Sequence, residues 1–318
     1  MKRILELLIW TLASGSALAQ SFPSKPVRFI TVAAPGTDIV TRIMAQEMAP
    51  QLGQQIVVEN RTGGSGLVGA DAGAKAPPDG YSVLFSTSGT MITNNFVIAR
   101  MPFDTFRDFT SLALVSSSPS VLLINQQFTP VNNMEELVDL ARKRPGELSF
   151  GSFGIGSLPN LVLSWVAKNA GVTFIHVPYK GSSDAYNDLY SGRLTMFMDP
   201  VGLPIGQVSA GKLYPVAVTS LKPNRLYPNT RPMAEAGVID FEAVTWWGSY
   251  VPSKTPREVS QRWIAEFEKA LGQPKVKVRI AEVGSDVGQL FGERFTAFER
   301  QEFERFRRIT IELGIRPE

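Results

Sequence analysis

The chain of 318 residues contains no cysteine and a single histidine, and these two shortages exclude several kinds of chemistry. Without a thiol there is no disulfide, no thiolate nucleophile and no cysteine-ligated metal. A serine-histidine-aspartate triad or a zinc site would depend on His176 alone, which lies in the strand-like segment TFIHVPY. We therefore expect His176 to be a core or hydrogen-bonded residue, and we expect neither catalytic residues nor a metal site.

Strong charge and long apolar runs are absent as well. The formal net charge is +3, with no run of basic residues and interleaved aromatics, so nucleic acid is not expected as a partner. No segment reaches the roughly 18 apolar residues that a membrane helix needs. Lys2 and Arg3, the short apolar stretch ILELLIWTLA and the motif ALA before Gln20 together predict a secretory signal peptide over residues 1–19. A buried N-terminal helix is the alternative, and the signal peptide implies an exported protein.

Strand-like and helix-like segments alternate through most of the chain. A strand over 27–33 is followed by a helix over 38–53, for example, and the same alternation continues to about residue 220. This order predicts parallel sheets covered by helices. The last third differs, with one long strand-like run over 241–253, two helices that start at Pro256 and Pro274, and a long amphipathic helix. The phenylalanines of that last helix recur at helical spacing, which predicts core packing.

Two glycine motifs suggest a nucleotide, but neither has the required context. Gly64, Gly66 and Gly69 form G-x-G-x-x-G, yet the segment NRTG separates them from the preceding strand and no acidic residue follows at the usual distance. The segment GQVSAGKL resembles a phosphate loop but has Leu213 where a serine or threonine should bind Mg²⁺. No G-x-S-x-G motif occurs. We expect no cofactor.

Two other glycine turns lead directly into helices. They are APGTD, which ends at Asp38, and GSFGIGS, which ends at Ser157. A helix N-terminus carries unpaired N–H groups and a partial positive charge, so two such ends facing one cleft would hold a carboxylate without an arginine. The residues alone leave a second interpretation open, in which both are ordinary capped helices.

Several segments, taken in order, resemble the Bug family, the extracytoplasmic solute receptors of tripartite tricarboxylate transporters. They cover essentially the whole chain after the signal peptide and read FPSKPVRFI, APGTDIVTR, VVENRTGGSGLVGADAGAKAPPDGYSVLF, MPFDTFRDF, HVPYKGSSDAYNDLYSGRL, AGKLYPVAVTS, RPMAEAG and LGIRPE.

The resemblance implies an α/β fold of the periplasmic-binding-protein type (type II), a two-lobe clamshell whose hinge the chain crosses twice. Lobe 1 is expected over 20–122 and 222–318, and lobe 2 over 123–221. The expected protein is a periplasmic, monomeric receptor that has no catalytic activity. It would capture a small organic carboxylate between its lobes and deliver it to the membrane subunits of the transporter. A ligand-sensing partner of a signalling protein is one alternative, and a nucleotide-dependent α/β enzyme is the other.

The resemblance also places the ligand-binding residues by position. They are expected in the first-lobe turn, in the STSGT segment, in the second-lobe turn and at the cleft floor, namely Gly36, Thr37, Asp38, Thr87, Ser88, Thr90, Ser152, Phe153, Gly154, Gly156, Ser157 and Asp199.

Two departures from the family pattern affect these expectations. The first turn is shorter than usual, which favours Asp38 as a helix cap over a ligand contact. An asparagine at this position would then keep the cap, fold normally and bind the acid at least as tightly. In the second turn, Phe153, Ile155 and Leu158 stand where small polar residues are usual. This favours a monocarboxylate or an aromatic acid, although these side chains would also suit packing beneath the turn.

Overall fold

The part of the chain that can be described begins after the N-terminal segment. The computed structural model describes residues 22–33, 38–179 and 181–317. The predicted signal peptide over 1–19 and the expected ligand residues Gly36 and Thr37 lie outside the described residues.

A mixed sheet organises the described residues. Ten strands follow the order β2-β1-β3-β9-β4-β7-β5-β6, and β8 and β10 each pair with β4. Their bounds are β1 Val27–Thr31, β2 Ile56–Asn60, β3 Ser82–Thr87, β4 Phe109–Ile124, β5 Ser149–Ser152, β6 Ile175–Pro178, β7 Met196–Pro200, β8 Tyr214–Val218, β9 Val244–Pro252 and β10 Asp286–Val287. The outer pairs β1–β2, β1–β3, β5–β6 and β5–β7 are parallel, as predicted, whereas β9 and β4 pair antiparallel with their neighbours.

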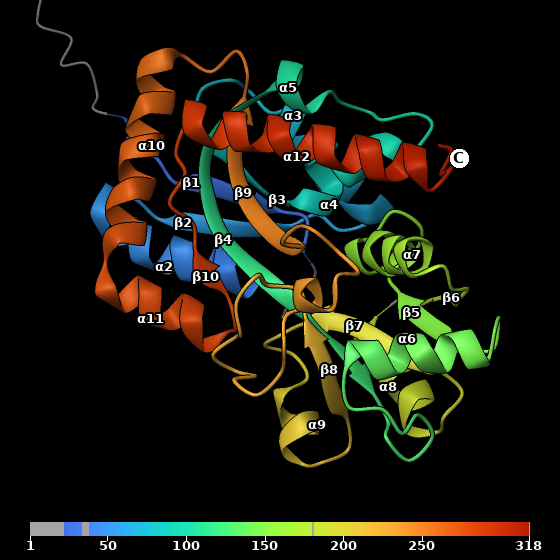
Figure 1. Ribbon diagram of the computed structural model, residues 1–318. Coiled ribbons are helices and arrows are strands. Elements are labelled where there is room, and N and C mark those ends of the chain that lie inside the picture. The colour runs from blue at the N-terminus through green and yellow to red at the C-terminus, as the bar shows by residue number, and fades with distance from the viewer. Residues whose placement is uncertain (1–21, 34–37, 180, 318) are drawn as a thin grey trace, which may run out of the picture.

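The sheet divides into two lobes that share β4. The first part of this strand, Phe109 to Pro119, pairs with β9, and the last part, Ser120 to Ile124, pairs with β7. Lobe 1 therefore contains β1, β2, β3, β9 and β10, and lobe 2 contains β5 to β8 (Figure 1). The chain returns between β8 and β9, where Thr219 N donates to Ser120 O at 2.9 Å. These two crossings are the expected double hinge.

Helices cover both lobes. Their bounds are α2 Ile39–Leu52, α3 Leu67–Ala74, α4 Ser88–Met91, α5 Thr105–Asp108, α6 Met134–Lys143, α7 Leu158–Ala170, α8 Ser182–Tyr190, α9 Ile205–Ser209, α10 Arg257–Gly272, α11 Pro274–Glu282 and α12 Glu293–Glu312, with 3₁₀ turns η1 Gly64–Gly66, η2 Thr93–Phe96 and η3 Met233–Ala236. Glycine ends α2 and α7, since Gly53 and Gly171 both adopt φ 64°, a conformation that other residues rarely accept. The predicted end of the helix over 38–53 is confirmed.

The core consists of three apolar clusters that follow the two faces of the sheet. The largest passes through both lobes and joins Leu84 of β3 to Phe150 of β5 and Val162 of α7. A second lies under α2, α10 and α11, and a third lies under α8. Because one cluster is continuous across the hinge, the lobes are packed against each other and not merely tethered. In Figure 1, α12 runs along the side of lobe 1 and its C-terminal end lies above α7 of lobe 2.

Candidate functional site

A cavity of about 190 Å³ lies between the lobes, next to the hinge. Lobe 1 and the first crossing supply the lining residues Thr87, Ser88, Gly89, Thr93, Ser120, Thr245 and Phe306, and lobe 2 supplies Phe153, Ser157, Leu158, Pro159 and Pro200. None of these twelve residues is charged. The cavity is smaller than the roughly 300–1,000 Å³ of sites for drug-sized ligands, so it suits a small molecule.

The lobe 1 side of the cavity is built where β3 ends. Thr87 is the N-cap of the short helix α4, and its hydroxyl accepts from the N–H of Thr90 at 3.3 Å. The next residue, Ser88, is 5% exposed, and its Oγ accepts from the N–H of Trp246 in β9 at 3.4 Å. These bonds fix two hydroxyl side chains at the carboxyl end of a strand, the edge where open α/β sheets bind ligands.

The lobe 2 side is the turn between β5 and α7. Gly154 and Gly156 adopt φ 107° and 78°, so the turn needs glycine at both positions. Within the turn, Ser157 Oγ donates to the carbonyl of Gly154 at 2.6 Å, and Gly156 N donates to Asn160 Oδ1 at 3.0 Å. The turn is therefore held by its own hydrogen bonds, and it presents the N-terminal end of α7 to the cavity together with Phe153.

The lobes touch beside this turn. A Cβ on Gly156 would lie 2.4 Å from the side chain of Val97, which follows η2 of lobe 1. Further from the hinge, Lys168 Nζ of α7 donates to the carbonyl and to Oε2 of Glu312 in α12, both at 2.9 Å. The described conformation thus has the two lobes in direct contact.

Ser152 and His176 form a close pair that lies below the cavity lining. Ser152 Oγ is 2.6 Å from His176 Nε2 and 3.1 Å from the carbonyl of Gly154. Ser152 is fully buried, and its hydroxyl supports the turn. Burial lowers the pKa of His176 below its ordinary value. The expectation of a hydrogen-bonded histidine is confirmed.

Thr90 faces the glycine segment 63–66 instead of the cavity. Its Oγ1 donates to the carbonyl of Ser65 at 3.1 Å, and Asn94 Nδ2 donates to the same oxygen at 3.0 Å. A Cβ on Gly66 would lie 2.2 Å from Thr90 Oγ1. Close packing against Thr90 thus accounts for the glycine at position 66 of the G-x-G-x-x-G motif.

Asp38 has a different role from the one expected. It precedes α2 but makes no side-chain capping bond, so the capping prediction is wrong. Its carboxylate is instead buried, with 1% exposure, and Oδ2 lies 2.8 Å from both the Arg42 guanidinium and Asn60 Nδ2. Arg42 of α2 supplies an opposite charge, and Asn60 of β2 supplies a hydrogen-bond donor. These contacts offset the cost of burying the carboxylate, which is larger than the contribution of a helix cap.

Asp199 lies at the end of β7, beside the lining residue Pro200, and is fully buried. Its Oδ2 accepts from the Tyr186 hydroxyl at 2.5 Å. Burial raises the pKa of Asp199 to about 6, while hydrogen bonds from Tyr186 and Ser182 act in the opposite direction. Burial and the nearby carboxylate also raise the pKa of Tyr186.

Of the expected site residues within the described chain, the structure brings Thr87, Ser88, Phe153 and Ser157 together around one cavity. It adds several residues that the sequence did not indicate. Ser120 and Thr245 come from the strands at the hinge, and Phe306 comes from a helix near the end of the chain. Phe306 has the same spacing as the core phenylalanines of α12, so no sequence signal separates it from them.

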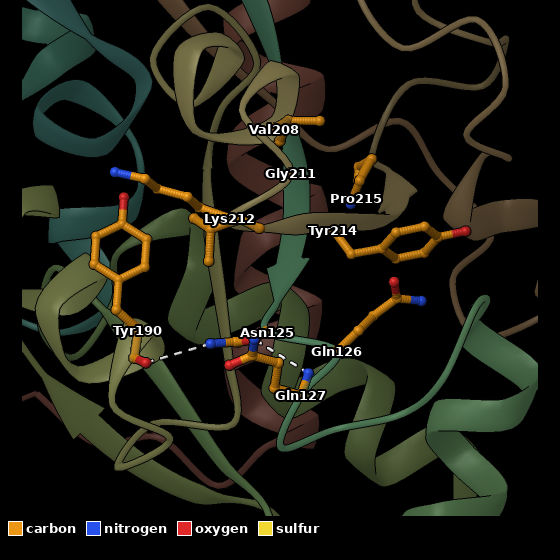
Figure 2. A pocket seen from close by; sticks show the side chains of 10 residues that line it. Asn125, Gln126, Gln127, Tyr190, Val208, Gly211, Lys212, Tyr214 and Pro215 are labelled. Atoms are coloured by element: carbon orange, nitrogen blue, oxygen red, sulfur yellow. Dashed lines mark hydrogen bonds between the residues drawn. The ribbon is translucent and has the colours of Figure 1, made fainter.

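A larger hollow of about 840 Å³ lies at the far end of lobe 2 (Figure 2). Asn125 and Gln126 line it from the end of β4, and Lys212 and Tyr214 line it from the start of β8. Two of its amides are already paired within the protein: Asn125 Nδ2 donates to the carbonyl of Tyr190, and Gln126 Nε2 to that of Val131. Since a single lobe forms it, movement of the lobes would not close it, and it is a weaker candidate than the smaller cavity.

The described residues offer neither a metal site nor a membrane-spanning helix. No group of three or more histidine, aspartate or glutamate side chains is arranged to hold a metal ion. Within the same ranges, no helix combines the length and the apolar character needed to cross a bilayer.

Comparison with known proteins is consistent with this architecture. The model of the tripartite tricarboxylate transporter family receptor matches residues 40–315. A UPF0065 protein encoded between tcbD and tcbE in Pseudomonas sp. strain P51 is 34% identical over 317 residues, covering 98% of this chain and 94% of that protein.

Solved structures agree with the sequence relatives. The R. palustris protein Rpa4515 with adipate has a TM-score of 0.84 at 30% identity, covering 94% of this chain and 100% of that chain. The periplasmic binding protein BugD has a TM-score of 0.80 at 30% identity, covering 93% and 100%. The chain therefore belongs to the tripartite tricarboxylate transporter receptors, the Bug family of two-lobed solute-binding proteins, which are receptors and not enzymes.

Proposed function

We propose that this protein is a periplasmic receptor that captures a small organic carboxylate in the cavity between its lobes. The observation that carries the proposal is the lining itself, in which hydroxyl side chains of lobe 1 and the N-terminal end of α7 surround one uncharged cavity. Hydroxyls and helix N-termini are donors to carboxylates. The adipate in the related Rpa4515 structure supports this class of ligand.

We further propose that a monomer delivers the acid to the membrane subunits of a tripartite transporter, after removal of residues 1–19. Lobe 1 would comprise 20–122 and 222–318, and lobe 2 would comprise 123–221. Gly36, Thr37 and Asp38 would stand beside the site on lobe 1, and Asp199 would support its floor.

Calorimetric titration with a panel of organic acids tests the capture of a ligand. Binding to the folded state alone would also raise thermal stability, by about 2.7 kcal/mol at 100 times Kd. Thr245→Val removes a lining hydroxyl without changing side-chain size and is expected to weaken binding severalfold. Thr110→Val, on β4 and away from this cavity, is the matched control and should bind normally. No heat or thermal shift with any acid would contradict the proposal.

Delivery is tested separately from capture. A strain that lacks this gene should lose uptake of the radiolabelled acid and recover it with the wild-type gene. Recovery with the Thr245→Val gene should be poorer at low concentrations of the acid. Unchanged uptake in the deletion strain would contradict a role in transport while leaving capture intact.

A further inference from the structure

The lining of the cavity is chemically uneven. Hydroxyl groups come from β3, α4, η2 and the two hinge strands, through Thr87, Ser88, Thr93, Ser120 and Thr245. Apolar side chains come from three other places, the α7 turn, the end of β7 and α12. Phe153 and Leu158 represent the first, Pro200 represents the second, and Phe306 represents the third. A ligand that fills the cavity must therefore meet donors at one part of its surface and hydrocarbon at another.

Phe306 is held firmly in its position. It is 2% exposed and lies on the buried face of α12, four residues after Glu302 and three before Ile309. The helix is packed against β4 and η2 of lobe 1, and its last turn is bonded to Lys168 of α7. The helix that carries Phe306 is thus held by contacts to both lobes.

The groups behind Phe306 disfavour a second anion. Glu302 lies one helical turn before it, is 2% exposed, and forms an ion pair with Arg305 at 2.6 Å. Arg305 thus has a partner within its own helix, and none of the described side chains that line the cavity is cationic. A carboxylate pressed against this apolar part would lose its hydration without gaining a charged partner, which is costly.

We propose that Phe306 is a specificity-determining residue, and that together with Phe153 it selects an acid with one carboxylate and an apolar body over a dicarboxylate of the same length. The inference rests on the proposed capture of a carboxylate in this cavity. It differs from what the adipate-bound relative would suggest, since adipate carries a carboxylate at each end.

Hexanoate and adipate form a matched pair of probes, because they share a six-carbon chain and differ only in the second carboxylate. We expect calorimetry to show that the wild-type protein binds hexanoate at least tenfold more tightly than adipate. Buried apolar contact is the physical reason, because removing hydrocarbon from water stabilises the complex in proportion to area.

Three variants connect this preference to Phe306. Phe306→Ala should weaken hexanoate at least tenfold and adipate much less, and Phe306→Leu should retain most of the affinity for hexanoate. Phe303→Ala is the control on the same helix, since Phe303 packs against Phe96 and Phe106 at ring distances of 4.7 and 5.5 Å and does not line the cavity. It should lose thermal stability but keep the preference between the two acids.

The outcomes separate this inference from the proposed function. Adipate binding as tightly as hexanoate, or tighter, would overturn the inference and leave the carboxylate receptor standing. Equal losses for both acids in Phe306→Ala would also overturn it, by showing a structural role only. Binding of neither acid would overturn the inference, and the full acid panel would then decide the proposed function.

Discussion

Glu299 of α12 is a carboxyl group buried in lobe 1 between the two strands that lead to the hinge. Its Oε2 accepts from Ser111 of β4 at 2.5 Å, and its Oε1 accepts from Tyr250 of β9 at 2.7 Å. Burial raises the pKa of Glu299 to about 7, against the smaller opposite effects of these hydrogen bonds and of Arg300. The folded state thus holds this proton more tightly than the unfolded chain, whose glutamate has the ordinary pKa of 4.5.

The raised pKa makes stability fall as pH rises. The contribution of the protonated acid is full below about pH 4.5 and is lost as the pH passes through 7, because the folded state binds more protons over that interval. Its size is about 3–4 kcal/mol, from the shift between 4.5 and about 7 at about 1.4 kcal/mol per pKa unit. Urea unfolding at several pH values should show this loss in the wild type, and Glu299→Gln should remove most of the loss between about pH 4.5 and 7. Asp199→Asn is the comparison, since its pKa of about 6 places its own loss at lower pH. Parallel curves for Glu299→Gln and wild type would contradict this assignment.

The ion pair of Asp38 changes what is expected of its asparagine variant. As a cap, Asp38 would tolerate asparagine, but the buried carboxylate bonded to Arg42 and Asn60 would not. We expect Asp38→Asn to lose about 1–3 kcal/mol of unfolding free energy, the value of hydrogen bonds to charged groups. Arg42→Met should cost a comparable amount, and the double variant should cost less than the sum of the two. Additive losses in urea unfolding would show that the two side chains do not act as a pair.

At the scale of elements, the sequence predicts helices better than it predicts the site. Gly53 stops α2 where expected, α10 follows Pro256, and α11 begins at Pro274. The buried position of Asp38 could not be predicted from the sequence, because its partner Asn60 comes from β2. The position of Phe306 beside the cavity could not be predicted either. Its helical spacing indicates a buried side chain but does not show whether that side chain faces the core or a cavity.

The turn between β5 and α7 is tightly fitted against lobe 1, and this predicts a defect that a second change corrects. Gly156→Ala would place a methyl group 2.4 Å from the Val97 side chain, so it should separate the lobes and weaken acid binding. Val97→Ala in the same chain should restore part of the affinity. Recovery should be incomplete because alanine at φ 78° remains strained.

A matched control separates the clash from the strain. Gly154 has φ 107°, but a Cβ there would meet no atom within 4 Å, so Gly154→Ala carries backbone strain without a clash. Calorimetric titration of the acid should show no gain when Val97→Ala is added to Gly154→Ala. An equal gain in both backgrounds would show that Val97 acts by another route.

For the whole molecule, the two lobes and their double hinge predict that the protein closes on its ligand. X-ray scattering should show a smaller radius of gyration with saturating acid than without it. Lys168→Met removes an exposed contact between the lobes, and exposed ion pairs contribute at most about 1 kcal/mol. We therefore expect a loss of affinity of no more than about fivefold, and expect the difference from wild type to shrink in high salt. An unchanged radius on binding would argue against closure.

The overall α/β alternation could be predicted from the sequence, but the course of the central strand could not. The segment Ser116 to Pro119 has the composition of a loop. In the structure this segment is the middle of β4, paired with β9, and proline is accepted where the strand changes partners. Long-range pairing outweighed local preference at the very place where the lobes meet.

Because β4 lies in the middle of both lobes, neither lobe would have a complete sheet if it were separated from the other. A fragment cut at the hinge would leave one half without its central partner and would expose two rows of backbone hydrogen-bonding groups. The lobes can thus move as separate bodies, but neither is a complete folding unit that could be exchanged as one segment of sequence. If one lobe were exchanged between relatives, the hybrid would carry β4 from only one parent, and that strand would have to pair with strands of the other parent. A new ligand preference is therefore more readily acquired by single substitutions around the cavity than by recombination of whole lobes.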